Sequence, residues 1–259
     1  MKEQLSLAFV IARYTLRELV KSRLLAISTV VSFLIVTISI VVAEFTYGAK
    51  TRVALDFGFG MAALSSVGIS IFMGNGLIFK EIESRTLYMV LARPITRISF
   101  LQGRSLGLMI FLAMNTIIMI LPSLGLYTML GGKIDGLFFW AAFFIFLESI
   151  IVMNVCILFS LISSQAFAAV FSLGVYIGGH TLSSEAFQTF LTRKPEYRFI
   201  DTFFSFFVPN LSGMNIKEHL LYKYQLSGAY LSEVTFHGFI YLLAILLISN
   251  IIFSKKNLN

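Results

Sequence analysis

Glu148 is the only charged residue between Gly136 and Ser184, in a stretch that is otherwise largely apolar. An ionisable group in the middle of an apolar segment is costly and usually faces a protein interior or a cavity. Two interpretations stay open: Glu148 lines a transport path, or a protonated Glu148 donates a hydrogen bond to a neighbouring helix. Asn115 and Asn154 also lie in apolar segments. They are either hydrogen-bond donors between helices or further residues of the transport path.

The other residues that could support chemistry are scattered. His180, His219 and His237 have no carboxylate or cysteine at the sequence spacing of metal ligands, so we expect no metal site. A phosphate-binding loop of the form GxxxxGK[ST] is absent, because Lys133 is followed by Ile134. Cys156 is the single cysteine and has no partner for an intrachain disulfide. We therefore expect a chain that is not an enzyme and carries no cofactor of its own.

The composition places these residues in a membrane protein. Hydrophobic residues make up 58% of the 259-residue chain, charged residues make up 13%, and the mean hydropathy is +0.87. A helix needs about 20 mostly apolar residues to cross a bilayer. The gaps between charged residues predict a single all-α transmembrane domain, 1–259, with six spans at about 24–43, 57–79, 105–130, 137–162, 166–184 and 234–254.

Basic residues indicate the orientation. They gather before the first predicted span, between the second and third, and at the chain end. Because Lys and Arg mark the cytoplasmic side of short loops, we expect both termini in the cytoplasm. The net charge of +7 then reflects topology and attraction to membrane lipid, and the scattered cations argue against nucleic acid as a partner.

Residues 2–23 precede the first span and mix basic residues with an apolar stripe. One helical face is apolar and another is basic, which predicts an interfacial helix lying on the inner leaflet. The alternative is a soluble cap that only orients the first span. The apolar face would carry Leu5, Phe9, Ala12, Leu16 and Leu19, and the basic face Arg13, Arg17 and Lys21.

A polar insert, residues 80–104, separates the second and third spans. Glu81 and Arg85 stand four residues apart, where helical side chains can pair. Pro94 lacks an amide proton and disfavours helical geometry at the preceding residue. The insert therefore predicts a helix, a bend and a second helix on the cytoplasmic face, with an ordinary solvated loop as the alternative. At its end, Gly103 and Gly107 permit close approach of helices and give weak evidence for a dimer face.

The insert resembles the segment between spans two and three of type-2 ABC transporter permeases. Residues 81–87 read EIESRTL, 91–97 read LARPITR and 100–104 read FLQGR. The nearest branch contains the permeases of nitrous-oxide reductase maturation and of gliding motility. Arg85 stands where that family usually has glycine. The positions that match the family pattern are Glu81 or Glu83, Thr86, Leu87, Pro94, Arg97, Gly103 and Arg104.

The resemblance implies a permease subunit that works with a second copy or a paralogue and with a dimer of cytoplasmic ABC ATPases. ATP and Mg would bind to those ATPases, and the insert would be the coupling helix that they move. The chain would export or extract a substrate by alternating access in a bacterial inner membrane, and an accessory protein outside the membrane is a further expected partner. The coupling residues would be Glu81, Glu83, Arg85, Thr86, Leu87, Pro94 and Arg97.

The segment 185–233 is too short and too interrupted by charge to cross the membrane. Its aromatic run FFSFFVPN predicts outer re-entrant or interfacial helices, broken at Pro209. In the related permeases, short outer helices cap the substrate route, so Phe203, Phe207 and Pro209 are candidate outer-gate residues. A packed outer subdomain without a gating role is the alternative.

An ATP-independent secondary transporter is the main rival function. Such a carrier needs charged residues in several spans for ion coupling, whereas Glu148 is the only one here. Many carriers also consist of two inverted halves, and this sequence has no visible internal repeat. These observations favour the permease.

Overall fold

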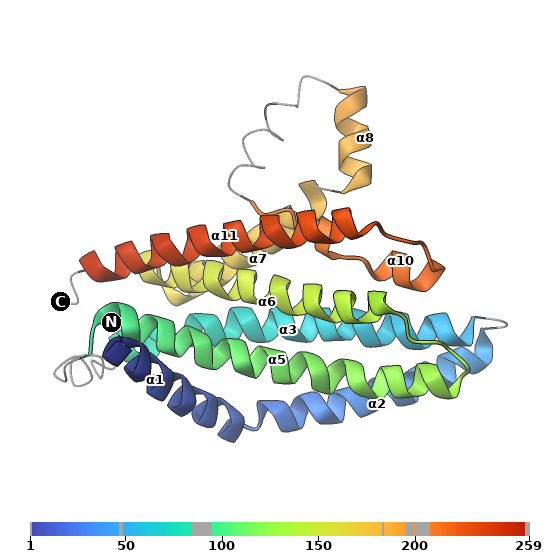
Figure 1. The fold of residues 1–259 in the computed structure, drawn as a ribbon, viewed down its shortest axis with the longest axis horizontal. Coiled ribbons are helices and arrows are strands. Elements are labelled where there is room, and N and C mark those ends of the chain that lie inside the picture. The colour runs from blue at the N-terminus through green and yellow to red at the C-terminus, as the bar shows by residue number, and fades with distance from the viewer. Residues whose placement is uncertain are drawn as a thin grey trace.

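In the computed structural model, the described residues are 2–46, 49–83, 95–182, 184–194, 199 and 208–256. They form helices and connecting turns, and none of them lies in a β-strand (Figure 1). The helices are α1 (Lys2–Lys21), α2 (Leu24–Phe45), α3 (Lys50–Glu83), α5 (Arg97–Met129), α6 (Gly136–Ile162), α7 (Gln165–Leu182), α8 (Glu185–Arg193), the 3-10 turn η2 (Ser212–Met214), α10 (Lys217–Tyr222) and α11 (Gly228–Lys255).

Five helices are long and apolar enough to cross a membrane: α2, the part of α3 from Lys50 to Leu77, α5, α6 and α11. The predicted span at 166–184 corresponds to α7, which has only 18 residues. It qualifies as a sixth span only together with Phe187–Arg193, to which it is bent by 63°. The described part of the chain is thus all-helical with five candidate spans, or six if the bent pair is counted as one span.

Two helices extend well past the predicted spans. α3 has 34 residues and α5 has 33, against predictions of 57–79 and 105–130. At about 1.5 Å per residue each is about 50 Å long, well over the roughly 30 Å of a hydrocarbon core. The spacing of charged residues predicted only the apolar part of each helix. Helical hydrogen bonding continues into the polar residues beyond it.

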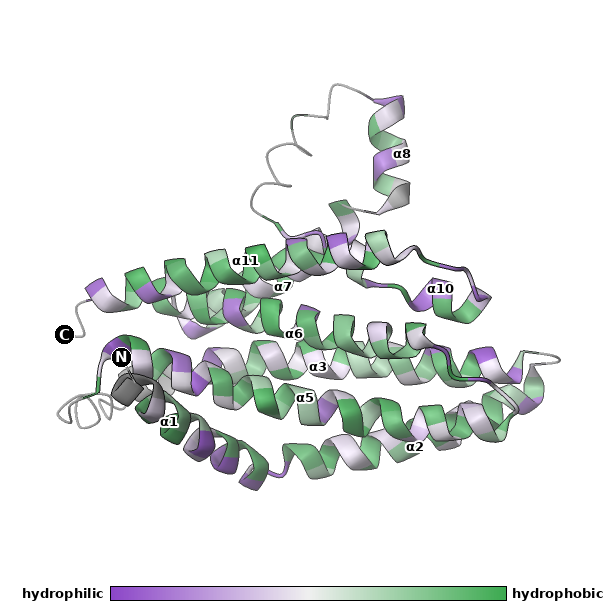
Figure 2. Cartoon of the chain, viewed as in Figure 1, coloured by the Kyte–Doolittle hydropathy of each residue, from purple (hydrophilic) through white to green (hydrophobic). Residues whose placement is uncertain are grey.

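α6 forms the centre of the bundle, with α3, α5, α7 and α11 packed around it (Figure 1). In its most apolar window 78% of the residues are buried, against 22% for α2 and 28% for α11. The peripheral helices α2 and α11 carry hydrophobic residues over their outer surfaces (Figure 2). This pattern is typical of a membrane bundle, in which the outermost side chains contact lipid.

α1 packs across the first third of α5. Gly103 and Gly107 make this possible, because a Cβ at Gly103 would lie 2.7 Å from the Ala8 carbonyl oxygen and one at Gly107 would lie 2.6 Å from Thr15 Cβ. The two glycines therefore hold a helix of the same chain, and the interpretation of this pair as a dimer face is wrong. The face of α1 that packs on α5 carries the buried residues Ala8, Ala12 and Thr15, and Phe9 on the predicted apolar stripe is 73% exposed at the surface of the bundle.

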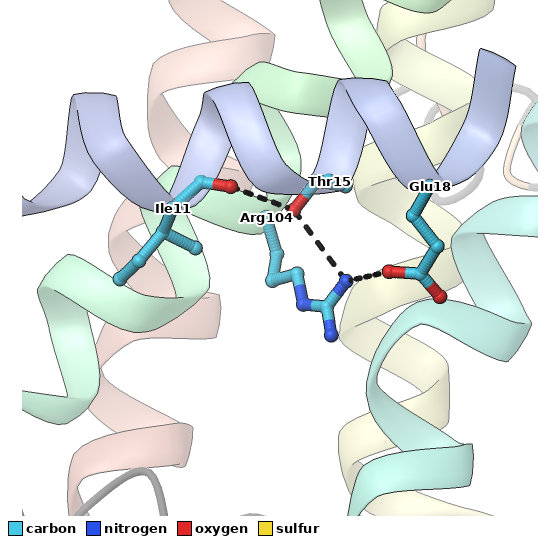
Figure 3. A network of polar contacts seen from close by, with 4 residues as sticks. All are labelled: Ile11, Thr15, Glu18 and Arg104. Atoms are coloured by element: carbon cyan, nitrogen blue, oxygen red, sulfur yellow. Dashed lines mark hydrogen bonds and ion pairs between the residues drawn. The ribbon is translucent and has the colours of Figure 1, made fainter. Parts of the chain in front are cut away.

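An ion pair completes this contact (Figure 3). Arg104 Nη1 donates to Glu18 Oε2 at 2.7 Å and lies 3.5 Å from Thr15 Oγ1, whose hydroxyl donates to the Ile11 carbonyl. The Arg104 side chain is 17% exposed. Residues of the predicted insert thus attach α1 to α5.

α1 begins and α11 ends at the same end of the bundle (Figure 1). Two basic side chains tie the helices together there. Arg97 Nη1 donates to the Lys256 carbonyl at 2.7 Å, and Lys256 Nζ donates to the Leu161 carbonyl at 2.7 Å. Cations at helix C-termini satisfy free carbonyl groups and complement the helix dipole. The ends of α6 and α11 are therefore fastened to the start of α5.

Candidate functional site

A cavity of about 230 Å³ lies between α3, α6, α7 and the segment 214–217. Most of its wall is apolar, with Phe59 and Leu64 from α3 and Ile145 from α6 among the residues that line it. The polar side chains in the wall are Glu148, Tyr176, His180, Asn215 and Lys217. An apolar pocket with a few convergent polar groups is the usual form of a small-ligand site.

Glu148 and His180 form the polar centre of this cavity. Glu148 Oε1 lies 2.5 Å from His180 Nε2, and the two side chains are 5% and 25% exposed. The Tyr176 ring packs edge-on against the imidazole, with 4.8 Å between ring centroids. His180 therefore has a carboxylate partner in space that lies 32 residues away in the sequence.

The hairpin of α6 and α7 brings this pair together. α6 ends at Ile162 and α7 begins at Gln165, so the two helices run antiparallel from a tight turn. Glu148 lies 16 residues before Ser164, and His180 lies 16 residues after it. Residues equidistant from a turn lie at the same height in an antiparallel helical hairpin. This symmetry is a sequence signal that would have paired the two residues.

The outer wall of the cavity depends on two glycines. A Cβ at Gly179 would lie 2.7 Å from the Pro209 carbonyl oxygen, and a Cβ at Gly238 would lie 2.6 Å from Met214 Cε. The chain from Pro209 to Met214 therefore packs against both α7 and α11. Pro209, a predicted outer-gate residue, is buried against Gly179, the residue before His180 on α7, and is not among the residues that line the cavity.

The charged side chains in the cavity wall differ in how deeply they are buried. The Lys217 ammonium pairs with Asp56 Oδ1 at 2.7 Å, and their side chains are 32% and 50% exposed. Glu148 is far less exposed than either of them. The deepest charged side chain in the wall is thus an acid, and the basic groups lie nearer the solvent.

Asn115 joins α5 to α3 inside the bundle. Its amide Nδ2 donates to Ser65 Oγ and Ser66 Oγ, each at 3.1 Å, and the residue has no exposed surface. Asn115 does not line the cavity that contains Glu148. Its contacts are those of an interhelical hydrogen-bonding residue.

Asn154 joins α6 to α5. Ser105 Oγ donates to Asn154 Oδ1 at 3.4 Å, and Asn154 Nδ2 donates to the Ile150 carbonyl at 2.9 Å. It is 2% exposed and does not line the cavity either. Of the three predicted path residues, the cavity wall contains only Glu148.

In the sequence, the predicted coupling residues lie at the end of α3, at the start of α5 and between the two helices. Glu81 and Glu83 belong to the last turn of α3, and their side chains are not among those described. Arg97 is the first residue of α5 and binds the end of α11. The remaining predicted residues outside the described ranges are Arg85, Thr86, Leu87 and Pro94 in the insert, and Phe203 and Phe207 in the outer segment.

Among the described residues, no group of three or more His, Cys, Asp or Glu side chains is placed to hold a metal ion. Comparison of the sequence with models of known families gave no match, and comparison with curated proteins gave none. The function must therefore be argued from the residues and the geometry.

Proposed function

We propose that this chain is the membrane-spanning permease subunit of an ATP-driven ABC transporter. The observation that carries the proposal is the pairing of α3 and α5. They are the two longest of the described helices, and they pack along each other. α3 ends and α5 begins at the end of the bundle where α11 also ends, and the predicted coupling segment lies between them in the sequence (Figure 1). Past the predicted span 57–79, α3 continues through residues 80–83.

α3 connects this segment with the cavity. Its residues Phe59 and Leu64 form part of the cavity wall, and the same unbroken helix ends at Glu83. A stiff helix transmits displacement along its axis. Closure of an ATPase dimer that holds the segment 84–94 would therefore move one wall of the cavity relative to α6 and α7, which is a route to alternating access.

The partner requirements follow from this arrangement. The chain contains no phosphate-binding loop, so ATP and Mg would bind to the cytoplasmic ATPase dimer. A second copy or a paralogue of the permease would provide the other half of the membrane domain. In this proposal Glu148 belongs to the substrate route and Pro209 to its outer closure.

The proposal is tested with a double variant, Glu81→Ala with Glu83→Ala. A tagged chain is purified from its native membranes in mild detergent, and ATP hydrolysis in the eluate is measured. The native chain should bring down an ATPase, and the double variant should lose it or lose the dependence of hydrolysis on the permease. The matched control, Glu44→Ala with Glu233→Ala, removes two exposed carboxylates from the opposite part of the bundle and should retain both. Normal ATPase assembly together with normal permease-dependent hydrolysis in the Glu81/Glu83 variant would refute the coupling assignment.

The second candidate is an ATP-independent secondary transporter. The Glu148–His180 contact favours it, because titratable pairs inside a membrane often serve ion coupling. The two functions differ in a simple respect. A secondary transporter would keep its activity in proteoliposomes that contain only this chain, and an ABC permease would be inactive there.

A further inference from the structure

We infer that the Glu148–His180 cavity binds a primary ammonium group carried on a short apolar stem, and that binding releases the proton held by the pair. The argument starts from the charge of the site. We infer a proton shared between Glu148 and His180 when no cation is bound, because Glu148 Oε1 and His180 Nε2 lie 2.5 Å apart and an isolated carboxylate among membrane helices is costly. In such a coupled pair the proton belongs to both groups.

A cation can take the place of that proton. An ammonium group donates three hydrogen bonds and satisfies a carboxylate as well as an imidazolium does. The exchange balances: the ammonium group binds Glu148 as a carboxylate, His180 becomes neutral, and one proton leaves to water. No covalent bond is formed or broken.

The depth of the charges favours a cation over an anion. Glu148 is the most buried charged group in the wall, whereas Lys217 lies near the mouth and is already paired with Asp56. An anion would have to displace Asp56 and would then meet Glu148. Among the described residues that line the cavity, the remaining titratable groups are Tyr176 and His180 on α7, so Glu148 carries the only carboxyl group in that lining.

The apolar wall residues and the volume of the cavity indicate what the rest of the ligand should be. Phe59, Leu64 and Ile145 offer apolar surface, and the aromatic faces of Phe59 and Tyr176 suit a nearby cation. The volume of about 230 Å³ is smaller than that of pockets for drug-sized ligands, about 300–1,000 Å³, which favours a compact amine. Its source is a soluble alkylamine or the ethanolamine head of a lipid.

Binding of the amine does not depend on the proposed function. Only the assignment of amines as the transported substrate class rests on that function. The test therefore uses the full chain alone, without an ATPase. n-Hexylammonium is titrated by isothermal calorimetry into the chain in phosphatidylglycerol nanodiscs at pH 7. The titration is repeated in phosphate and in MOPS, two buffers of different ionisation enthalpy, to count released protons.

We expect one site per chain and up to one proton released per amine bound. Glu148→Gln keeps the shape of the side chain and should weaken binding by about tenfold or more, the effect of losing a charge-assisted hydrogen bond. His180→Gln leaves Glu148 to hold the proton by itself, so this variant should still bind the amine and still release up to one proton. Each added CH₂ from butylammonium to hexylammonium should tighten binding roughly fourfold, because the stem lies on an apolar wall.

The control Glu44→Gln removes a carboxylate that pairs with Lys50 at the end of α2, and it should bind as the native chain does. Phosphatidylethanolamine is then added to the nanodiscs to identify the source of the amine. Competition between this lipid and hexylammonium indicates the lipid head group as the ligand, and no competition indicates a soluble amine. Equal affinity of Glu148→Gln and the native chain would overturn the inference, as would amine binding to the native chain without proton release.

Discussion

Single polar residues connect the helices of this bundle, and Ser32 is the clearest case. Pro122 lies inside α5 and has no amide proton, so the carbonyl of Ile118, four residues earlier, loses its helical partner. Ser32 Oγ on α2 lies 3.1 Å from that carbonyl oxygen and 3.3 Å from that of Met119. In a membrane such a carbonyl needs a donor from a neighbouring helix, which explains why the buried position 32 of α2 carries a serine.

Ser32→Ala should therefore destabilise the folded chain by about 0.6–1.7 kcal/mol, the range for interhelical hydrogen bonds in membranes. Pro122→Ala restores the amide proton, and in that background Ser32→Ala should cost measurably less. Unfolding of the four proteins of this double-mutant cycle in mixed micelles gives the coupling energy. Additive effects would show that Ser32 does not serve the freed carbonyl.

Among the helices, α1 depends most on close backbone contact. It is seated on α5 through Gly103 and Gly107 and held by the ion pair of Arg104 with Glu18 (Figure 3). The amphipathic pattern of residues 2–23 predicted a helix but assigned its apolar stripe to lipid. The tertiary structure pairs its small residues Ala8 and Ala12 with the glycines of α5, and a periodicity of one helix cannot reveal the partner surface.

Gly107→Ala tests this seating. The new Cβ would lie 2.6 Å from Thr15 Cβ and 2.7 Å from the Ala12 carbonyl oxygen, so α1 must shift at a cost of about 1–3 kcal/mol. Limited proteolysis should then release residues 2–21 faster than in the native chain. Gly125→Ala is the matched control on the same helix, because nothing lies within 4 Å of its added Cβ. Equal cleavage of both variants would contradict the seating.

A second element-scale contact holds the end of α11. Arg97→Ala removes the donor to the Lys256 carbonyl and should loosen the last turn of α11, at a cost of about 1.5–3 kcal/mol for a charged hydrogen bond. Hydrogen exchange of the amides near Lys255 reports the change. The control Arg193→Ala lies in α8, where the side chain is exposed, and should leave that exchange unaltered.

At the scale of the whole molecule, the arrangement places both chain ends at one end of the bundle and the α5–α6 connection at the other (Figure 1). The basic residues predict that the end with the termini is cytoplasmic. Cys156 is fully buried, so the native chain offers no exposed thiol among its described residues and suits labelling experiments.

Two single-cysteine additions test the orientation. Lys133→Cys lies at the α5–α6 connection and Lys255→Cys at the end of α11, and both native residues are exposed. A membrane-impermeant maleimide should label Lys133→Cys in intact cells and label Lys255→Cys only after the membrane is permeabilised. The reverse pattern would invert the topology and remove the insert from the cytoplasm.

The sequence by itself determined that the chain is helical, where its apolar segments lie and that Glu148 is an unusual acid among them. These features follow from local composition, because a bilayer requires long apolar helices whatever their neighbours are. The pairing of His180 with Glu148 follows from their equal distance to the α6–α7 turn, whereas the tertiary structure alone decided Ser65 and Ser66 as partners of Asn115 and α1 as the partner of Gly103 and Gly107. Lipid gives no hydrophobic preference between helix faces, so pairing depends on close packing and hydrogen bonds that form only when the whole bundle is assembled.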